Sequence, residues 1–154
     1  MNSKIGPLFL VASAQGLESI FWQAQDVPFI ESLSDSNPES IILKNAVQQL
    51  EQYLNGQRTS FDLKLAAEGT KFQKKVWQEL SKIPFGKTTS YIEIARKIGN
   101  EKASRAVGAA NGKNPLCIVV PCHRVVNANG KPGGYSGGLQ IKEKLLNLEA
   151  AVKV

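Results

Sequence analysis

The spacing of apolar residues changes at residues 66–70, and this change limits the folds open to the chain. Before it, short runs such as "FDLKL" at residues 61–65 alternate apolar and polar side chains, as strands do. After it, apolar residues recur at the spacing of one helix face. We therefore expect an α+β protein with two domains, an α/β domain over residues 1–68 and a mostly helical one over residues 69–154.

The first domain has the signals of a hairpin followed by a helix. Residues 7–13 and 17–23 predict two strands joined by a tight turn. Asn37-Pro38 is typical of the start of a helix, and Asn55-Gly56 is typical of its end. Residues 61–65 predict a third strand. Nothing in this domain suggests a reaction.

The second domain begins with helices that carry recognisable caps. Thr70 and Gln73 predict a capping box, and Ser90 and Glu93 predict another. Gly99-Asn100 ends the second of these helices, and a third runs from about residue 103 to residue 111. Two short helices joined by a four-residue turn with a glycine form the helix-turn-helix pattern, although many helical hairpins bind nothing.

The third predicted helix has two different faces. Its inward positions are Ala103, Ala106, Val107 and Ala110, and its outward positions are Arg105, Gly108, Ala109 and Gly112. One cation among very small side chains would let a helix backbone approach the wall of a DNA groove. Glycine inside a helix costs about 1 kcal/mol relative to alanine, so Gly108 needs a reason. Close approach to DNA and packing within its own domain both remain open.

Charge is distributed unevenly along the chain. Residues 71–154 hold fifteen Lys or Arg against five Asp or Glu, whereas residues 1–70 hold four against eight. The second domain would therefore attract a polyanion such as nucleic acid or an anionic membrane surface, unless its charges form a solvated basic face. No apolar stretch has the length needed to cross a bilayer, so we expect no membrane-spanning segment.

The stretch "IVVPCHRVV" at residues 118–126 combines the apolar character of a buried strand with reactive side chains. Cys122 is one of two cysteines, and His123 is the only histidine. A histidine can take the proton of a thiol and so produce the nucleophilic thiolate. Neighbours on a regular strand point to opposite faces, so either Pro121 bends the chain or a water relays the proton. Glu143 or Glu149 could orient the ring, and an inert, buried cysteine is the competing interpretation.

The remaining chemistry-bearing residues exclude several classes of site. Two cysteines five residues apart form no disulfide framework, which fits a reducing compartment such as the cytoplasm. Cys117, Cys122 and His123 are the only soft metal ligands, and a structural zinc site takes four. The glycine-rich residues 127–138 could line a pocket, but they lack the Lys-Ser/Thr of a phosphate-binding loop. We expect neither a metal nor another cofactor.

With these residues in place, the sequence resembles the O6-alkylguanine-DNA alkyltransferases, or methylated-DNA–protein-cysteine methyltransferases. "IVVPCHRVV", "SYIEIA", "RAVGAANGKNP" and "YSGGLQIKEKLL" match the motifs of that family in order and spacing, over about residues 70–150. The first domain fits the family's small RNase H-like domain only in layout. The resemblance implies that the second domain contains a winged helix-turn-helix-like DNA-binding unit.

The resemblance also implies a single-use reaction. Cys122 would take an alkyl group from O6 of guanine, or from O4 of thymine, in double-stranded DNA and would keep it permanently. His123 would act as the base through a water, and Glu149 would hold the imidazole. Asn114 would be the hinge between the helix pair and the segment that carries the cysteine.

The same resemblance assigns residues to the flipped base. Tyr91 would help to rotate the nucleotide out of the duplex and would donate to guanine N3. The main chain at Cys122 and Val125 would accept from the exocyclic amine, and Tyr135 and Ser136 would close over O6. Lys142 would neutralise charge near the leaving oxygen.

A further set would contact DNA through the minor groove, with Arg105 filling the stack that the nucleotide leaves. The residues that the resemblance places there are Ser90, Arg105, Ala106, Gly108 and Ala109. Two departures from the family pattern, Cys117 and Asn111, bear on the tolerance for bulky alkyl groups. We expect a monomer. The alternatives to a transferase are a regulator that only binds DNA and a Cys-His hydrolase of small esters or amides.

Overall fold

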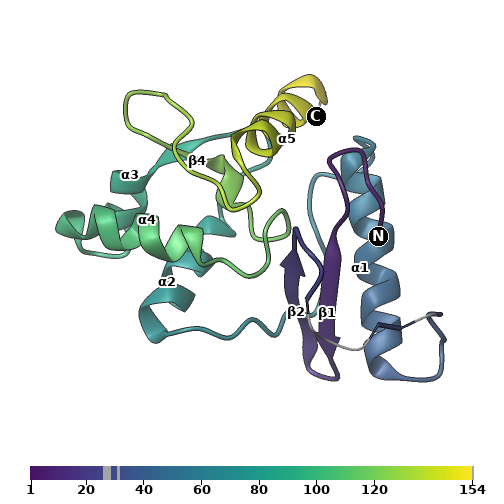
Figure 1. Cartoon of the computed structure of the whole chain (residues 1–154). Helices are drawn as coiled ribbons and strands as arrows, with labels where there is room; N and C mark the ends of the chain where they lie inside the picture. The colour runs from purple at the N-terminus through teal and green to yellow at the C-terminus, as the bar shows by residue number, and fades with distance from the viewer. Residues whose placement is uncertain (26–28, 31, 154) are drawn as a thin grey trace. The chain divides into compact units, whose positions relative to one another are not determined.

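The structure, a computed structural model, describes residues 1–25, 29–30 and 32–153. The chain forms two compact units, Met1–Glu68 and Gly69–Val154, of which the first combines a hairpin with a helix and the second is mostly helical (Figure 1). The predicted α+β class is therefore confirmed. Within the described part of the chain, each helix is too short or too polar to span a lipid bilayer.

The N-terminal unit is a two-stranded antiparallel sheet covered by one helix. Strand β1 (Phe9–Ser13) pairs with β2 (Gly16–Phe21), and helix α1 (Pro38–Leu54) packs against both (Figure 1). The predicted helix start is confirmed, because the side chain of Asn37 accepts a 2.8 Å hydrogen bond from the Ser40 N–H. The core of the unit is apolar, and its buried residues include Leu8, Leu17, Ile20, Ala46, Leu50, Tyr53 and Leu54.

The predicted third strand at residues 61–65 is wrong. Only Leu65 forms a bridge, with Leu17 of β2, and the rest of the segment has no ladder. The side chain of Gln49 takes the place of a partner strand, because it accepts from the Asp62 N–H at 2.8 Å and donates to the Asp62 carbonyl at 2.9 Å. A Cβ at Gly16 would lie 2.6 Å from the Lys64 carbonyl oxygen, so this close approach requires glycine.

The C-terminal unit consists of four α-helices with short connecting elements. The helices are α2 (Lys71–Leu80), α3 (Tyr91–Lys97), α4 (Ser104–Gly112) and α5 (Leu139–Ala151). Two 3-10 turns, η1 (Glu101–Ala103) and η2 (Cys122–Arg124), and two short parallel strands, β3 (Thr89–Ser90) and β4 (Val125–Val126), complete it.

Helix α2 supports the helix pair that follows it. The capping box of Thr70 and Gln73 is present as predicted. Trp77 is buried, and its indole N–H donates a 2.8 Å hydrogen bond to the carbonyl of Ala110 in α4. This bond fixes the last turn of α4, because the tryptophan is itself held in the core.

Helices α3 and α4 form the predicted pair, with two local differences. Ser90 caps α3 by accepting from the Glu93 N–H, but the Glu93 carboxylate pairs with Arg96 rather than returning to the cap. The prediction that Ala106 faces inward is wrong: the residue is exposed, because it lies to one side of the face that Ala103, Val107 and Ala110 bury. Val107 and Ala110 are buried as predicted.

Helix α5 buries charged as well as apolar side chains. Its buried residues are Lys142, Leu145 and Glu149, whereas the apolar Leu139 is 55% exposed. Burial of a charged side chain is expensive unless it is paired. The partners of Lys142 and Glu149 lie in the segment around Cys122.

Candidate active site

The segment that carries Cys122 is a turn rather than the predicted buried strand. Pro121 has φ −81° and ψ 65°, the values of an inverse γ-turn, and the Cys122 N–H donates across it to the Val120 carbonyl at 2.8 Å. Residues 122–124 then form the 3-10 turn η2, and only β4 is extended. Of the two routes left open by the sequence, the structure shows that Pro121 does bend the chain.

Cys122 is enclosed by polar groups but is protonated at rest. Cys122 is 2% exposed to solvent. Burial raises the pKa of the Cys122 thiol from its ordinary value of 9.0 to about 11, although the Asn114 side chain, the Lys142 charge and backbone N–H groups at Cys122 and His123 lower it. The thiolate therefore has a prepared polar environment, while the free protein holds the thiol at neutral pH.

Asn114 joins the end of the helix pair to the Cys122 turn. Its side-chain N–H donates to the Val120 carbonyl at 2.8 Å, and its carbonyl oxygen accepts from the Leu116 N–H at 3.0 Å. The same side chain lowers the pKa of the Cys122 thiol. The position suits the hinge role that the resemblance implies for this residue.

His123 is a buried, neutral imidazole bound to Glu149. The Nε2 atom lies 2.8 Å from Glu149 Oε1. Burial lowers the pKa of His123 more than the neighbouring Glu149 raises it. Because a carboxylate only accepts hydrogen bonds, Nε2 carries the proton and Nδ1 carries the lone pair of a base.

Arg124 is a member of this network that sequence reasoning missed. Its guanidinium donates to both carboxylate oxygens of Glu149, at 2.8 to 3.1 Å, and to the Ile83 carbonyl at 2.6 Å. It also lies 5.7 Å from the centre of the Phe85 ring. Glu149 thus serves His123 and Arg124 together. A charged residue inside an apolar run was the signal that could have identified Arg124.

A cavity of about 250 Å³ opens beside the thiol. The residues that line it are Tyr91, Gly108, Asn111, Gly112, Cys122, Gly134, Tyr135 and Ser136. Five of the predicted site residues therefore meet at one cavity, namely Tyr91, Gly108, Cys122, Tyr135 and Ser136. Burial, with a smaller effect of the Cys122 charge, raises the pKa of Tyr91, so its hydroxyl remains a hydrogen-bond donor at neutral pH.

Lys142 holds the glycine-rich loop against β4. Its ammonium group is fully buried and donates to the carbonyls of Val125 at 2.7 Å, Gly134 at 3.1 Å and Pro132. Burial lowers the pKa of Lys142, and the charge of Cys122 partly offsets this. All three N–H bonds of the ammonium group are used, so its main contact is with the loop and its effect on the thiol is electrostatic.

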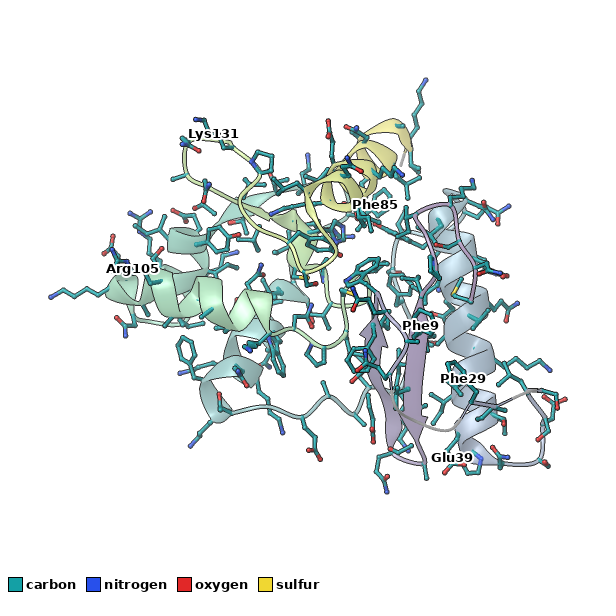
Figure 2. All side chains as sticks on the ribbon, viewed as in Figure 1. Phe9, Phe29, Glu39, Phe85, Arg105 and Lys131 are labelled. Carbon is teal, nitrogen blue, oxygen red and sulfur yellow. The ribbon has the colours of Figure 1, made fainter. Side chains whose placement is uncertain are left out.

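The residues predicted to contact DNA lie on the outside of the helix pair. Arg105, Ala106 and Ala109 are exposed on α4, and Figure 2 shows Arg105 at the outer end of that helix. Gly108 lies on this face and also borders the cavity. A Cβ at Gly108 would meet only the Tyr91 ring, at 3.8 Å, which is ordinary contact. Packing within the unit therefore does not explain this glycine.

Two features, one in the cavity wall and one beside it, were not identified as functional from the sequence. Asn111, which the sequence marks only as a departure from a family pattern, is a buried polar member of the wall. Gly133 has φ +71°, and a Cβ there would lie 2.9 Å from the Tyr91 hydroxyl oxygen, so glycine keeps that hydroxyl in place. Neither follows from residue spacing, because both depend on how the loop meets α3 and α4.

Both units of the chain match families of known proteins. Residues 71–151 match the family described as "6-O-methylguanine DNA methyltransferase, DNA binding domain", and residues 1–67 match its "ribonuclease-like domain". The chain is 50% identical over 151 residues to a protein of Methanosarcina acetivorans named methylated-DNA–protein-cysteine methyltransferase, covering 97% of this chain and 96% of that one. A Mycobacterium leprae protein of the same name is 46% identical over 97% of this chain and 89% of its own length.

Solved structures agree with the sequence relatives. The Mycobacterium tuberculosis OGT in complex with DNA has a TM-score of 0.85 and 44% identity, covering 98% of this chain and 91% of that one. An O6-methylguanine DNA methyltransferase from Methanococcus jannaschii has a TM-score of 0.68 and 33% identity, covering 96% and 90%. The predicted combination of a ribonuclease-like domain and a helical DNA-binding domain is confirmed. This chain belongs to the 6-O-methylguanine DNA methyltransferase family.

Proposed function

We propose that this protein repairs double-stranded DNA by moving a methyl or larger alkyl group from O6 of guanine to the sulfur of Cys122. The observation that carries the proposal is the thiol itself, which lies at a cavity lined by hydroxyl groups and is backed by a buried His123–Glu149 pair. The relatives named methylated-DNA–protein-cysteine methyltransferase support the same reaction. Alkyl transfer from O4 of thymine is part of the proposal as a second substrate.

The reaction is a displacement at the alkyl carbon. A bond forms between that carbon and the Cys122 sulfur, and the bond between the carbon and O6 breaks. The electron pair of the broken bond stays on O6 and the guanine ring, to which Tyr91 donates a hydrogen bond at N3. The ring then gains one proton, which balances the proton that the thiol gives to His123. The thioether has no route back to a thiol, so each molecule acts once.

His123 removes the thiol proton when the substrate is bound. The resting thiol has a pKa of about 11, so few free molecules hold the thiolate at neutral pH. The neutral imidazole of His123 accepts the proton at Nδ1, directly or through a water. Glu149 stabilises the imidazolium that results. Asn114 and Lys142 lower the energy of the thiolate at the same time.

The pocket recognises the base through the groups around the thiol. The carbonyls of Cys122 and Val125 accept from the exocyclic amine, while Tyr135 and Ser136 close over O6. Lys142 supports this arrangement, because its ammonium group orients the Val125 carbonyl and holds the loop that carries Tyr135 and Ser136. It acts by positioning the loop and by its charge.

The outer face of α4 docks in the minor groove, which suits a helix with small side chains. Arg105 enters the stack in place of the flipped nucleotide, and Ser90, Ala106, Gly108 and Ala109 lie against the sugar-phosphate backbone. The space available at Gly108 for a Cβ supports this assignment, because internal packing does not require glycine there. Contacts of Lys and Arg with phosphates would give salt-sensitive binding without sequence preference. We place the protein, as a monomer, in the cytoplasm, where the free thiols of Cys117 and Cys122 stay reduced.

Intact-mass spectrometry tests the proposal. The protein is incubated with an excess of a duplex containing O6-methylguanine. We expect a gain of one methylene per molecule, located on Cys122 by peptide mapping, and one equivalent of restored guanine. The Cys117→Ser variant is the matched control and should gain the same mass, whereas Cys122→Ser should gain none.

Two other functions predict different results. A protein that only binds DNA would bind the duplex and stay unmodified, with the lesion intact. A Cys-His hydrolase would release product from a small ester or amide in many turnovers per molecule and would not gain mass from DNA. Either result would remove the proposal.

A further inference from the structure

Asn111, a residue of the cavity wall, has an unsatisfied hydrogen-bond acceptor in its side chain. The residue is 6% exposed and lines the cavity next to Cys122. Its Nδ2 group donates a long hydrogen bond of 3.5 Å to the Cys122 carbonyl. Among the residues that the structure describes, its Oδ1 atom is buried and has no hydrogen-bond partner.

The orientation of this amide is fixed by its neighbour. Rotating the amide by half a turn would direct Oδ1 at the Cys122 carbonyl and bring two acceptors together. The unpaired atom is therefore the oxygen. A buried carbonyl without a partner lowers stability by an amount comparable to a lost hydrogen bond, so its presence at a cavity favours a ligand that supplies the missing donor.

The chemistry of the proposed substrate identifies that donor. Alkylation at O6 removes the hydrogen from N1 of guanine, so the exocyclic amine at C2 is the only N–H donor left on the six-membered ring. N1, N3 and O6 are acceptors and would repel Oδ1. A hydrogen-bond acceptor in this pocket can therefore pair with the six-membered ring only through its exocyclic amine.

We propose that Asn111 Oδ1 accepts a hydrogen bond from the exocyclic amine of the flipped base and so selects purines that carry a 2-amino group. The inference rests on the proposed function. The Cys122 carbonyl lies beside the same amide, so the two oxygens share one hydrogen of the amine, and the other hydrogen remains for the Val125 carbonyl. Helix α4 fixes the position, since Trp77 holds the neighbouring Ala110 carbonyl at 2.8 Å.

The test compares two substrates that differ only in the amine. Single-turnover rates of methyl transfer are measured with matched duplexes that contain O6-methylguanine or O6-methylhypoxanthine. The wild-type protein should prefer the guanine lesion. In Asn111→Leu, which has nearly the same size but no acceptor, we expect this preference to fall about tenfold, the effect of one hydrogen bond in a buried site.

Two more variants make the result independent of folding. Asn111→Ala also lacks the acceptor and should show the same loss if the leucine variant fails to fold. In Asn111→Asp a protonated carboxyl group can donate its hydroxyl to the Cys122 carbonyl and keep its other oxygen at the Oδ1 position, so this variant should retain the preference even if both substrates react more slowly. The preference is a ratio, so a general loss of activity cancels from it.

The outcomes separate the two proposals. If the wild-type protein transfers methyl from O6-methylguanine but the preference is the same in Asn111→Leu and Asn111→Ala, the role of Asn111 is wrong and the proposed function stands. A wild-type protein that transfers methyl from both duplexes at the same rate would also overturn the role of Asn111. If the wild-type protein accepts methyl from neither duplex, the proposed function itself fails.

Discussion

The two units of this protein differ in what they bury. Among the described residues of the N-terminal unit, Ser40 is the only buried polar side chain, and the rest of its core is apolar. The C-terminal unit buries six polar or charged residues, namely Asn111, Asn114, His123, Arg124, Lys142 and Glu149. All six lie at the Cys122 turn, at the cavity or on groups that hold them.

The comparison shows that the second unit, unlike the first, buries groups that cost stability but support chemistry. An apolar core gains free energy from every residue that it buries. A buried charge must recover its lost hydration from partners, and a replacement by apolar residues is often no less stable. The polar groups of the second unit are therefore best explained by what they do to Cys122.

The largest effect should follow removal of the charge on Glu149. Glu149→Gln leaves the buried guanidinium of Arg124 without a counter-ion, and breaking a buried pair in this way costs about 3–5 kcal/mol. The loss of general-base support should also slow methyl transfer by at least about 100-fold. Chemical denaturation and single-turnover rates measure the two effects.

A variant of the N-terminal unit serves as the control for Glu149→Gln. Leu50→Ala should cost about 2–5 kcal/mol of stability, because a fully buried side chain is lost, but the transfer rate per folded molecule should not change. Glu143→Gln, on the exposed face of α5, should alter neither quantity. If Leu50→Ala and Glu149→Gln slow transfer equally, the division between a folding unit and a reacting unit is wrong.

The second-largest effect should be a loss of stability at alkaline pH. Burial raises the pKa of Cys122 from 9.0 to about 11, so between these values the unfolded chain loses a proton that the folded chain keeps. The unfolded state then binds fewer protons, and stability must fall as pH rises through this range, by up to about 3 kcal/mol. Denaturation of the wild-type and Cys122→Ser proteins at pH 8 to 11 measures it, since only the wild-type protein has this contribution. Parallel curves for the two proteins would mean that the thiol is not buried in solution.

Local signals in the sequence predicted the helices of this chain well. The caps at Asn37 and Thr70 and the break at Gly99-Asn100 mark helix ends because side chains or glycine satisfy backbone groups nearby in the sequence. The prediction of a strand at residues 61–65 was wrong because Gln49 of the preceding helix, α1, supplies hydrogen bonds that a partner strand would supply. Alternation of apolar and polar residues alone does not distinguish a strand from a segment that is hydrogen-bonded to a side chain.

The candidate site was predictable from its motif and not from its pattern of burial. The Pro-Cys-His-Arg sequence directed attention to Cys122 and His123, yet the apolar flanks suggested a strand where the chain makes a turn. Helix α5 has charged residues on its buried face, so apolar periodicity does not reveal that face, and the apolar Leu139 is exposed. Functional polar groups break the rule on which such a search depends.

The smallest effect should come from Gly108, which belongs to the exposed surface of the reacting unit. Gly108→Ala should raise stability by up to about 1 kcal/mol, because alanine is the better helix former and a Cβ has room beside Tyr91. The affinity for undamaged duplex should nevertheless fall severalfold, since the added methyl group keeps the helix from the groove wall. Its dependence on salt should be unchanged, because no phosphate contact is lost. Fluorescence anisotropy over a salt series, with thermal melting of both proteins, measures these quantities. A variant that gains stability and keeps its affinity would show that α4 does not approach DNA through Gly108.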